Sequence, residues 1–223
     1  MQFYDRLQQE TQSERNFLLT SPVIEDVMQG EFSLQTYIAF LDQAYHHVKH
    51  TVPLLMLAGA RLQPQQQWMQ SALSEYIMEE SGHELWILND LEACGAARER
   101  DVAPFDSEIM VAYLYDTIQR INPAGVFGMV QVLEGTSVSL ATTVAGIVQS
   151  KLGLPDAAMS YLTSHGTLDQ EHLQHLKRIL DQIDDTQDQN AIIHVACNVY
   201  RLYGNVFRAI PDEATRLQDR AAA

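Results

Sequence analysis

The spacing of apolar and polar residues along the chain predicts a series of amphipathic helices. Apolar side chains recur every three to four positions, and no Asn-Gly or Asp-Gly turn lies between alternating apolar runs. Glycine and proline mark the expected helix ends. The first helix covers 3–19. A short helix follows, with Ser21 as its N-cap, Pro22 in its first turn and Gly30 at its end.

Three further helices are expected before residue 122. The first covers 33–62, with a kink or break at Pro53. The second, over 64–95, contains Gly82, which lowers helix propensity by about 1 kcal/mol relative to alanine and suits a bend. The third covers 107–121 and is capped by the serine at its start.

The helix expected over 122–153 has an unusual composition. Between Arg120 and Lys151, Glu134 is the only ionisable side chain among small and apolar residues. Such a helix is buried on nearly all sides. A carboxylate there costs several kcal/mol unless a cation or hydrogen-bond donors compensate it. A bound metal would provide that compensation.

Two helices are expected in the last third of the chain. The first begins at Pro155 and reaches His165. A capping-box pattern follows Gly166, so this helix is either interrupted there or continues unbroken. The second covers 190–210. A tail over about 212–223 is expected to fray.

Composition indicates a globular protein with a single domain over 1–223 and no linker or internal repeat. The net charge of −15 argues against binding nucleic acid or an anionic membrane. Cys94 and Cys197 lie far apart, which disfavours a disulfide framework or a thiolate zinc site. The N-terminus lacks a basic segment followed by an apolar one, so a cytoplasmic location is predicted. Gln131 and Glu134 make the apolar helix a core helix rather than a membrane span.

A metal centre is the chemistry that the polar residues favour. His165, Asp169 and His172 are spaced i, i+4 and i+7, which places them on one stripe of an unbroken helix. Imidazole nitrogen with carboxylate oxygen suits iron or manganese better than structural zinc. The proposed ligands are six residues from three helical segments: Glu80, His83, Glu134, His165, Asp169 and His172. Glu79 is an alternative to Glu80, because either lies one helical turn before His83.

Several other residues are candidates for the surroundings of the metals. They are Tyr161, one turn before His165, with His47, His50, Leu133 and Met129. Tyr161 is a candidate hydrogen-bond partner of a ligand, and the apolar neighbours would keep water away. Each of these residues also has a simpler interpretation as a core or surface residue.

These residues resemble those of the haem-oxygenase-like diiron oxidases and oxygenases. The resemblance is carried by Glu80-x-x-His83, Glu134 in a middle helix, and His165-x-x-x-Asp169-x-x-His172. The segment 40–55, FLDQAYHHVKHTVPLL, is also similar to the second helix of that superfamily. The family implies an all-α bundle of seven to eight helices without haem, two Fe(II) ions per chain (manganese being the alternative metal) and O2 as co-substrate.

Three departures narrow this resemblance. No histidine precedes His46, whereas haem oxygenases have a proximal histidine in their first helix. Neither Cys94 nor Cys197 matches the nucleophile of thiaminase-type relatives. Leu133 stands where the para-aminobenzoate-forming relative has a tyrosine, so that reaction is not expected.

The hypothesis is therefore an iron-dependent oxidase or oxygenase acting on a small biosynthetic substrate of the amino-acid or fatty-acid class. One alternative is a metal-free helical module of the same fold that binds a small molecule or carries out cofactorless oxidation. The other is a non-catalytic interaction or metal-buffering protein. No nucleic-acid or membrane partner is expected, and long apolar helices are compatible with a homodimer.

Overall fold

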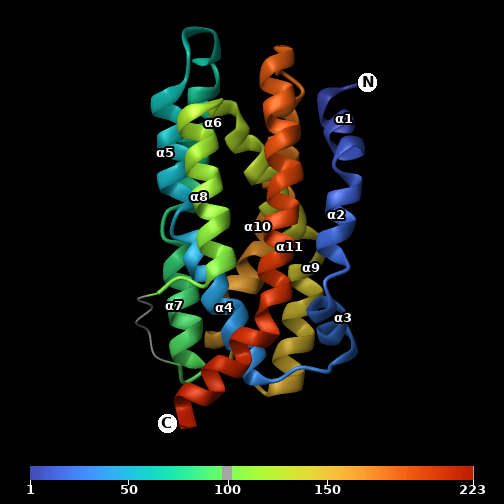
Figure 1. Cartoon of the computed structure of the whole chain (residues 1–223), viewed down its shortest axis with the longest axis vertical. Coiled ribbons are helices and arrows are strands. Elements are labelled where there is room, and N and C mark those ends of the chain that lie inside the picture. The colour runs from blue at the N-terminus through green and yellow to red at the C-terminus, as the bar shows by residue number, and fades with distance from the viewer. Residues whose placement is uncertain (97–101, 223) are drawn as a thin grey trace.

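The protein is a bundle of α-helices, most of which run along the long axis of the molecule (Figure 1). The computed structural model describes residues 1–96 and 102–222, with the side chains of 165–172 and 220–222 left out. The α-helices are α1 Phe3–Glu10, α2 Gln12–Leu19, α3 Pro22–Gln29, α4 Leu34–Val48, α5 Thr51–Arg61, α6 Met69–Glu80, α7 His83–Ala93, α8 Phe105–Arg120, α9 Val126–Leu152, α10 Ser160–Leu180 and α11 Thr186–Ala222. Short 3-10 turns at Pro64–Gln66, Pro123–Gly125 and Asp156–Ala158 precede α6, α9 and α10. The predicted all-α fold is confirmed.

Two of the predicted helices in the N-terminal third are divided. The helix expected over 3–19 breaks at Thr11 into α1 and α2. The helix expected over 33–62 breaks at Lys49 and His50 instead of at Pro53. The proline ring clashes with the carbonyl four residues earlier, which belongs to Lys49, so the break falls there. Pro53 then lies in the first turn of α5, where its missing N–H needs no partner.

Gly82 breaks the helix that was predicted to continue through it. Its φ of 96° lies in the left-handed region, which glycine adopts without steric penalty. Helix α6 therefore ends at Glu80, and α7 begins at His83.

The two predicted serine caps differ in outcome. Ser21 is the N-cap residue of α3, as predicted, but its side chain makes no capping hydrogen bond. The cap predicted at Ser107 is wrong. The Ser21 hydroxyl donates to the Leu18 carbonyl. Helix α8 begins at Phe105, and the Ser107 hydroxyl within its first turn donates to Gln43.

The second half of the chain forms three long helices, of which α9 packs against the other two. Helix α9 ends at Gly153, as predicted, and α10 continues through Gly166 without interruption. Helix α11 does not end before Pro211 but continues to Ala222, and Figure 1 shows its last turns leaving the direction of the earlier ones. Prolines bend helices in this way without always ending them.

The core lies where α9 and α11 meet their neighbours. Helix α9 packs extensively against α10, and α11 packs against α2, α4, α8 and α9. The helix over Pro123–Leu152 is long and apolar enough to cross a membrane, but 67% of its most apolar window is buried inside the molecule. Such burial is typical of a core helix, as predicted. Glu134 therefore lies on a core helix of the fold and is itself buried.

Candidate functional site

Glu80 and His83 face each other across the junction of α6 and α7. The Glu80 side chain is 11% exposed and the His83 side chain is 5% exposed, and His83 Nδ1 lies 3.1 Å from Glu80 Oε2. The left-handed Gly82 between them turns the chain so that the two side chains meet. Glu79, the alternative ligand, is exposed and does not line the pocket described below. The geometry therefore favours Glu80 over Glu79.

The His83 ring is held in place by an aromatic neighbour. Trp86, one turn later on α7, stacks on the imidazole with ring centroids 4.1 Å apart and planes inclined by 24°. Stacking of this kind restricts the rotation of the imidazole.

A buried carboxylate on the same helix joins α7 to the start of α10. Asp90 is 0% exposed, and it accepts hydrogen bonds from Ser160 N (3.0 Å), Tyr161 N (2.8 Å) and the Ser160 hydroxyl. Burial raises the pKa of Asp90, and these hydrogen bonds oppose that shift. The helix that carries His83 is thereby fixed against the helix that carries His165.

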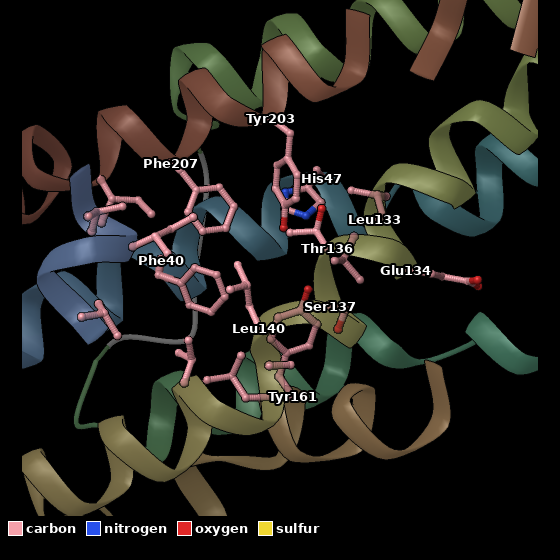
Figure 2. Close-up of a pocket in the computed structure, with 18 of the residues that line it drawn as sticks. Phe40, His47, Leu133, Glu134, Thr136, Ser137, Leu140, Tyr161, Tyr203 and Phe207 are labelled. Carbon is pink, nitrogen blue, oxygen red and sulfur yellow. The ribbon is translucent and has the colours of Figure 1, made fainter. Parts of the chain in front are cut away.

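Glu134 and Glu80 line the same pocket, although they come from different helices. Glu134 is 7% exposed, and Figure 2 shows its carboxylate pointing away from the aromatic residues at the other end of the pocket. Two carboxylates in one apolar pocket repel each other unless protons or cations neutralise them. This is the electrostatic condition that a metal ion satisfies.

Three of the six proposed ligands, His165, Asp169 and His172, lie outside the residues whose side chains the structure describes. Their backbone belongs to the continuous helix α10, so their i, i+4, i+7 register is kept. Helix α10 packs against both α9 and α7. Among the side chains that are described, no group of three or more His, Cys, Asp or Glu is close enough to hold a metal ion.

The donor types that are described fit iron. Glu80 and Glu134 supply carboxylate oxygen in a pocket that is otherwise largely apolar. His83 is not part of the lining, but it contacts Glu80 and supplies imidazole nitrogen. Thiols are absent from the described lining, which disfavours structural zinc. The remaining donors would come from α10.

The pocket is a narrow cavity of about 140 Å³. An engineered cavity of about 150 Å³ in another protein binds benzene, so the space suits a small organic molecule. Its lining on α9 extends from Met129 to Val148, which corresponds to about 28 Å of helix. The described lining contains no lysine or arginine, and most of it is aliphatic or aromatic. An elongated, mainly apolar ligand fits this shape.

Four of the five candidate neighbours line this pocket: Met129, Leu133, His47 and Tyr161. His47 is buried and its Nδ1 lies 2.9 Å from the Gln43 carbonyl, a contact that orients the ring. His50 is not part of the lining. Its Nδ1 contacts the Tyr115 hydroxyl at 3.1 Å, and burial together with the charge of Lys49 lowers its pKa.

Comparison with known proteins identifies the family. Residues 38–204 match the family described as iron-containing redox enzymes. The chain belongs to this family. The resemblance predicted from the sequence is thereby confirmed at the level of the family.

Solved structures confirm the haem-oxygenase-like fold of the chain. A domain of unknown function from Shewanella denitrificans has a TM-score of 0.84 at 24% identity, covering 98% of this chain and 95% of that one. A TenA homologue from Pseudomonas syringae has a TM-score of 0.76 at 13% identity, with coverage of 94% and 93%. Haem oxygenase-1 from Synechocystis, in complex with haem, has a TM-score of 0.77 at 10% identity, with coverage of 100% and 98%. A search of curated proteins found no match.

Several aromatic residues that shape the pocket carry little signal in the sequence. Phe207 and Tyr203 lie four residues apart on α11, and their ring centroids are 5.0 Å apart. Phe40 on α4 lies 6.2 Å from Phe207 and 6.2 Å from Tyr161. The i, i+4 spacing on α11 places two aromatic rings on one face. The sequence does not reveal that this face meets α4 and α9.

Proposed function

We propose that this chain is an O2-activating non-haem oxidase or oxygenase that holds two iron ions and oxidises a small, mostly apolar organic substrate. The observation that carries the proposal is the contact of His83 with Glu80, whose side chain lines the same pocket as Glu134. Membership of the iron-containing redox enzymes supports it. When bound, the iron pair would supply the redox chemistry, with manganese as the alternative metal.

The proposed ligand roles follow the arrangement of the helices. Glu80, His83 and His165 would hold one ion, and Asp169 and His172 the other. Glu134, from the opposite helix, would bridge the two or bind either one. The stacked Trp86 and the capped start of α10 would hold the imidazoles in orientation.

The shape of the pocket favours one of the two substrate classes expected from the sequence. A lining of aliphatic and aromatic residues along α9 excludes water and suits an extended hydrocarbon chain. An amino acid would bring two charged groups into a described lining that has no lysine or arginine, whereas a fatty acid would bring one carboxylate, which bound iron would neutralise. We therefore favour a substrate of the fatty-acid class.

A metal-free small-molecule-binding module is the second candidate function. Glu80 and His83 contact each other at 3.1 Å, and this pair provides mutual compensation without a metal. The cavity also has room for a small organic molecule beside this pair. A cofactorless oxidase of the same fold would use the same residues to bind its substrate.

Anaerobic Fe(II) loading separates the two functions. We expect about two iron ions per chain, as in other dinuclear helix-bundle sites, and large losses of bound iron in H83A, E80Q, E134Q and H172A. E79Q is the matched control, because Glu79 is exposed and should load as the wild type does. Normal loading of H83A and H172A would refute the ligand assignment. A wild-type protein that binds no iron would favour the metal-free module.

Tryptophan fluorescence gives a second, independent measurement. The chain has two tryptophans, Trp68 and Trp86, so a W68F variant reports on Trp86 alone. Because Trp86 stacks on His83, Fe(II) bound at His83 should quench its emission. The W86F variant retains only Trp68, which lies just before α6, and should show little quenching.

A further inference from the structure

One tyrosine of the pocket is surrounded mainly by other rings. Tyr203 on α11 is 7% exposed and belongs to the pocket lining. Its ring packs edge-on against His47, with centroids 5.3 Å apart, and edge-on against Phe207, with centroids 5.0 Å apart. Figure 2 shows Tyr203 beside His47, with Phe207 towards the aromatic end of the pocket. Tyr203 thus lies between the polar and the apolar parts of the cavity.

The Tyr203 hydroxyl forms no hydrogen bond with any residue in the part of the chain that the structure describes. Burial raises its pKa, and neither a hydrogen bond nor a neighbouring charge contributes to that shift. The hydroxyl therefore keeps its proton and is a donor at physiological pH. The hydroxyl is not one of the fully buried polar atoms that lack a partner, so it is accessible from the cavity, where a bound molecule would accept its hydrogen bond.

A second tyrosine of the same pocket shows the usual arrangement. Tyr37 on α4 is also buried, and its hydroxyl donates to the Ala158 carbonyl at 2.8 Å. That bond joins α4 to the turn before α10 and leaves no proton for a ligand. The two tyrosines therefore differ in one respect: the Tyr37 proton is used by the fold, and the Tyr203 proton is directed towards the cavity.

The surroundings of Tyr203 hold its ring in one position. The contact of His47 Nδ1 with the Gln43 carbonyl immobilises the imidazole against which Tyr203 packs. Phe207 supports the ring from the next turn of α11. A fixed donor in an apolar cavity discriminates strongly between ligands that accept its hydrogen bond and ligands that do not.

We propose that Tyr203 is a substrate-binding residue that donates a hydrogen bond to a carbonyl-type oxygen on an otherwise apolar ligand. The proposal rests on the proposed function only in that this pocket is the substrate site. It does not require iron. The ligand would lie along α9, with its oxygen at Tyr203 and its hydrocarbon portion among the aliphatic residues of the lining.

Two isosteric probes test the proposal on metal-free protein. Octan-2-one carries a ketone oxygen where 2-methyl-1-octene carries a methylene group, and headspace gas chromatography measures the binding of both. We expect the ratio of ketone affinity to alkene affinity to be about tenfold higher in the wild type than in Y203F. This factor corresponds to the free energy of one hydrogen bond. The affinity for the alkene should not change. Y37F is the matched control and should retain the wild-type ratio.

Thermal unfolding provides a measurement that needs no ligand. Y203F should melt at or above the wild-type temperature, because the Tyr203 hydroxyl that it removes makes no hydrogen bond within the described part of the fold. Y37F should melt below it, because it loses the bond to Ala158. A ratio unaffected by Y203F, a Y203F melting temperature as low as that of Y37F, or no binding of either probe would overturn the proposal. Failure of iron loading would leave all of these results unchanged, so the two proposals can fail separately.

Discussion

The contact between α9 and α11 at Gly128 allows a sharp test of the packing that positions Glu134. A Cβ atom at Gly128 would lie 2.5 Å from the Ile192 carbonyl oxygen and 2.9 Å from Ala196 N. Both are backbone atoms of α11 and cannot rotate away, so G128A must separate the two helices. Overpacking of this kind costs about 1–3 kcal/mol. The higher helix propensity of alanine returns about 1 kcal/mol of that cost.

Gly146 is a matched control on the same helix. It is exposed, and a Cβ atom there would meet nothing within 4 Å. G146A should therefore stabilise the protein by up to about 1 kcal/mol through helix propensity alone. The propensity contribution cancels between the two variants, so G128A should be less stable than G146A by about 1–3 kcal/mol. For a chain of this size, each kcal/mol corresponds to about 2–4 °C in Tm.

Urea unfolding followed by circular dichroism measures both variants, and iron loading then shows whether the separation of α9 from α11 disturbs the site. We expect G128A to retain less iron than G146A, because Glu134 lies less than two turns after Gly128. Equal stability of the two variants would refute the close approach of α9 and α11.

Two further predictions concern Asp90 on α7 and Cys94, the half-buried residue that directly follows this helix. D90N should destabilise the protein by about 1–3 kcal/mol, because its amide group faces the Tyr161 N–H donor. Because burial raises the pKa of Asp90, the difference in free energy of unfolding between the wild type and D90N should shrink as the pH rises above about 4. Urea titrations of both proteins at several pH values measure this difference. A difference that stays constant with pH would contradict the prediction. Burial, with the charge of Asp90, raises the pKa of Cys94 to about 11. Its alkylation by iodoacetamide, measured by peptide mass spectrometry, should therefore keep accelerating up to that pH, whereas a plateau near pH 9 would contradict the burial.

The sequence predicted the helices better than the places where they break. Periodicity and glycine stops identified the fold class and the ends of α3 and α9, because these signals are local. The predicted position of the break at Pro53 was wrong because the steric clash of a proline acts four residues upstream, on the carbonyl of Lys49. The predicted helix end before Pro211 was wrong because packing along α11 outweighs one missing hydrogen bond.

The burial of Glu134 was predictable from residue types alone, because it is the only ionisable side chain in a long apolar segment. Its compensation by a metal stays a prediction. Tyr203 carried no comparable signal, because a tyrosine on an amphipathic helix is usually a core residue. Only the approach of α4 and α9 to α11 gives it a place in the pocket. The choice between Glu79 and Glu80 also required the left-handed Gly82, which a continuous helix would have concealed.

The break at Gly82 means that one donor closes α6 and the other opens α7. A metal ion bound by Glu80 and His83 would therefore link two helices across a hinge, which an ion bound within one continuous helix would not do. Metal occupancy and the rigidity of the junction between α6 and α7 would then depend on the same binding equilibrium. Amide hydrogens around Ser81 should exchange with solvent more slowly once iron is bound, and metal affinity should fall in any variant that loosens the angle between the two helices.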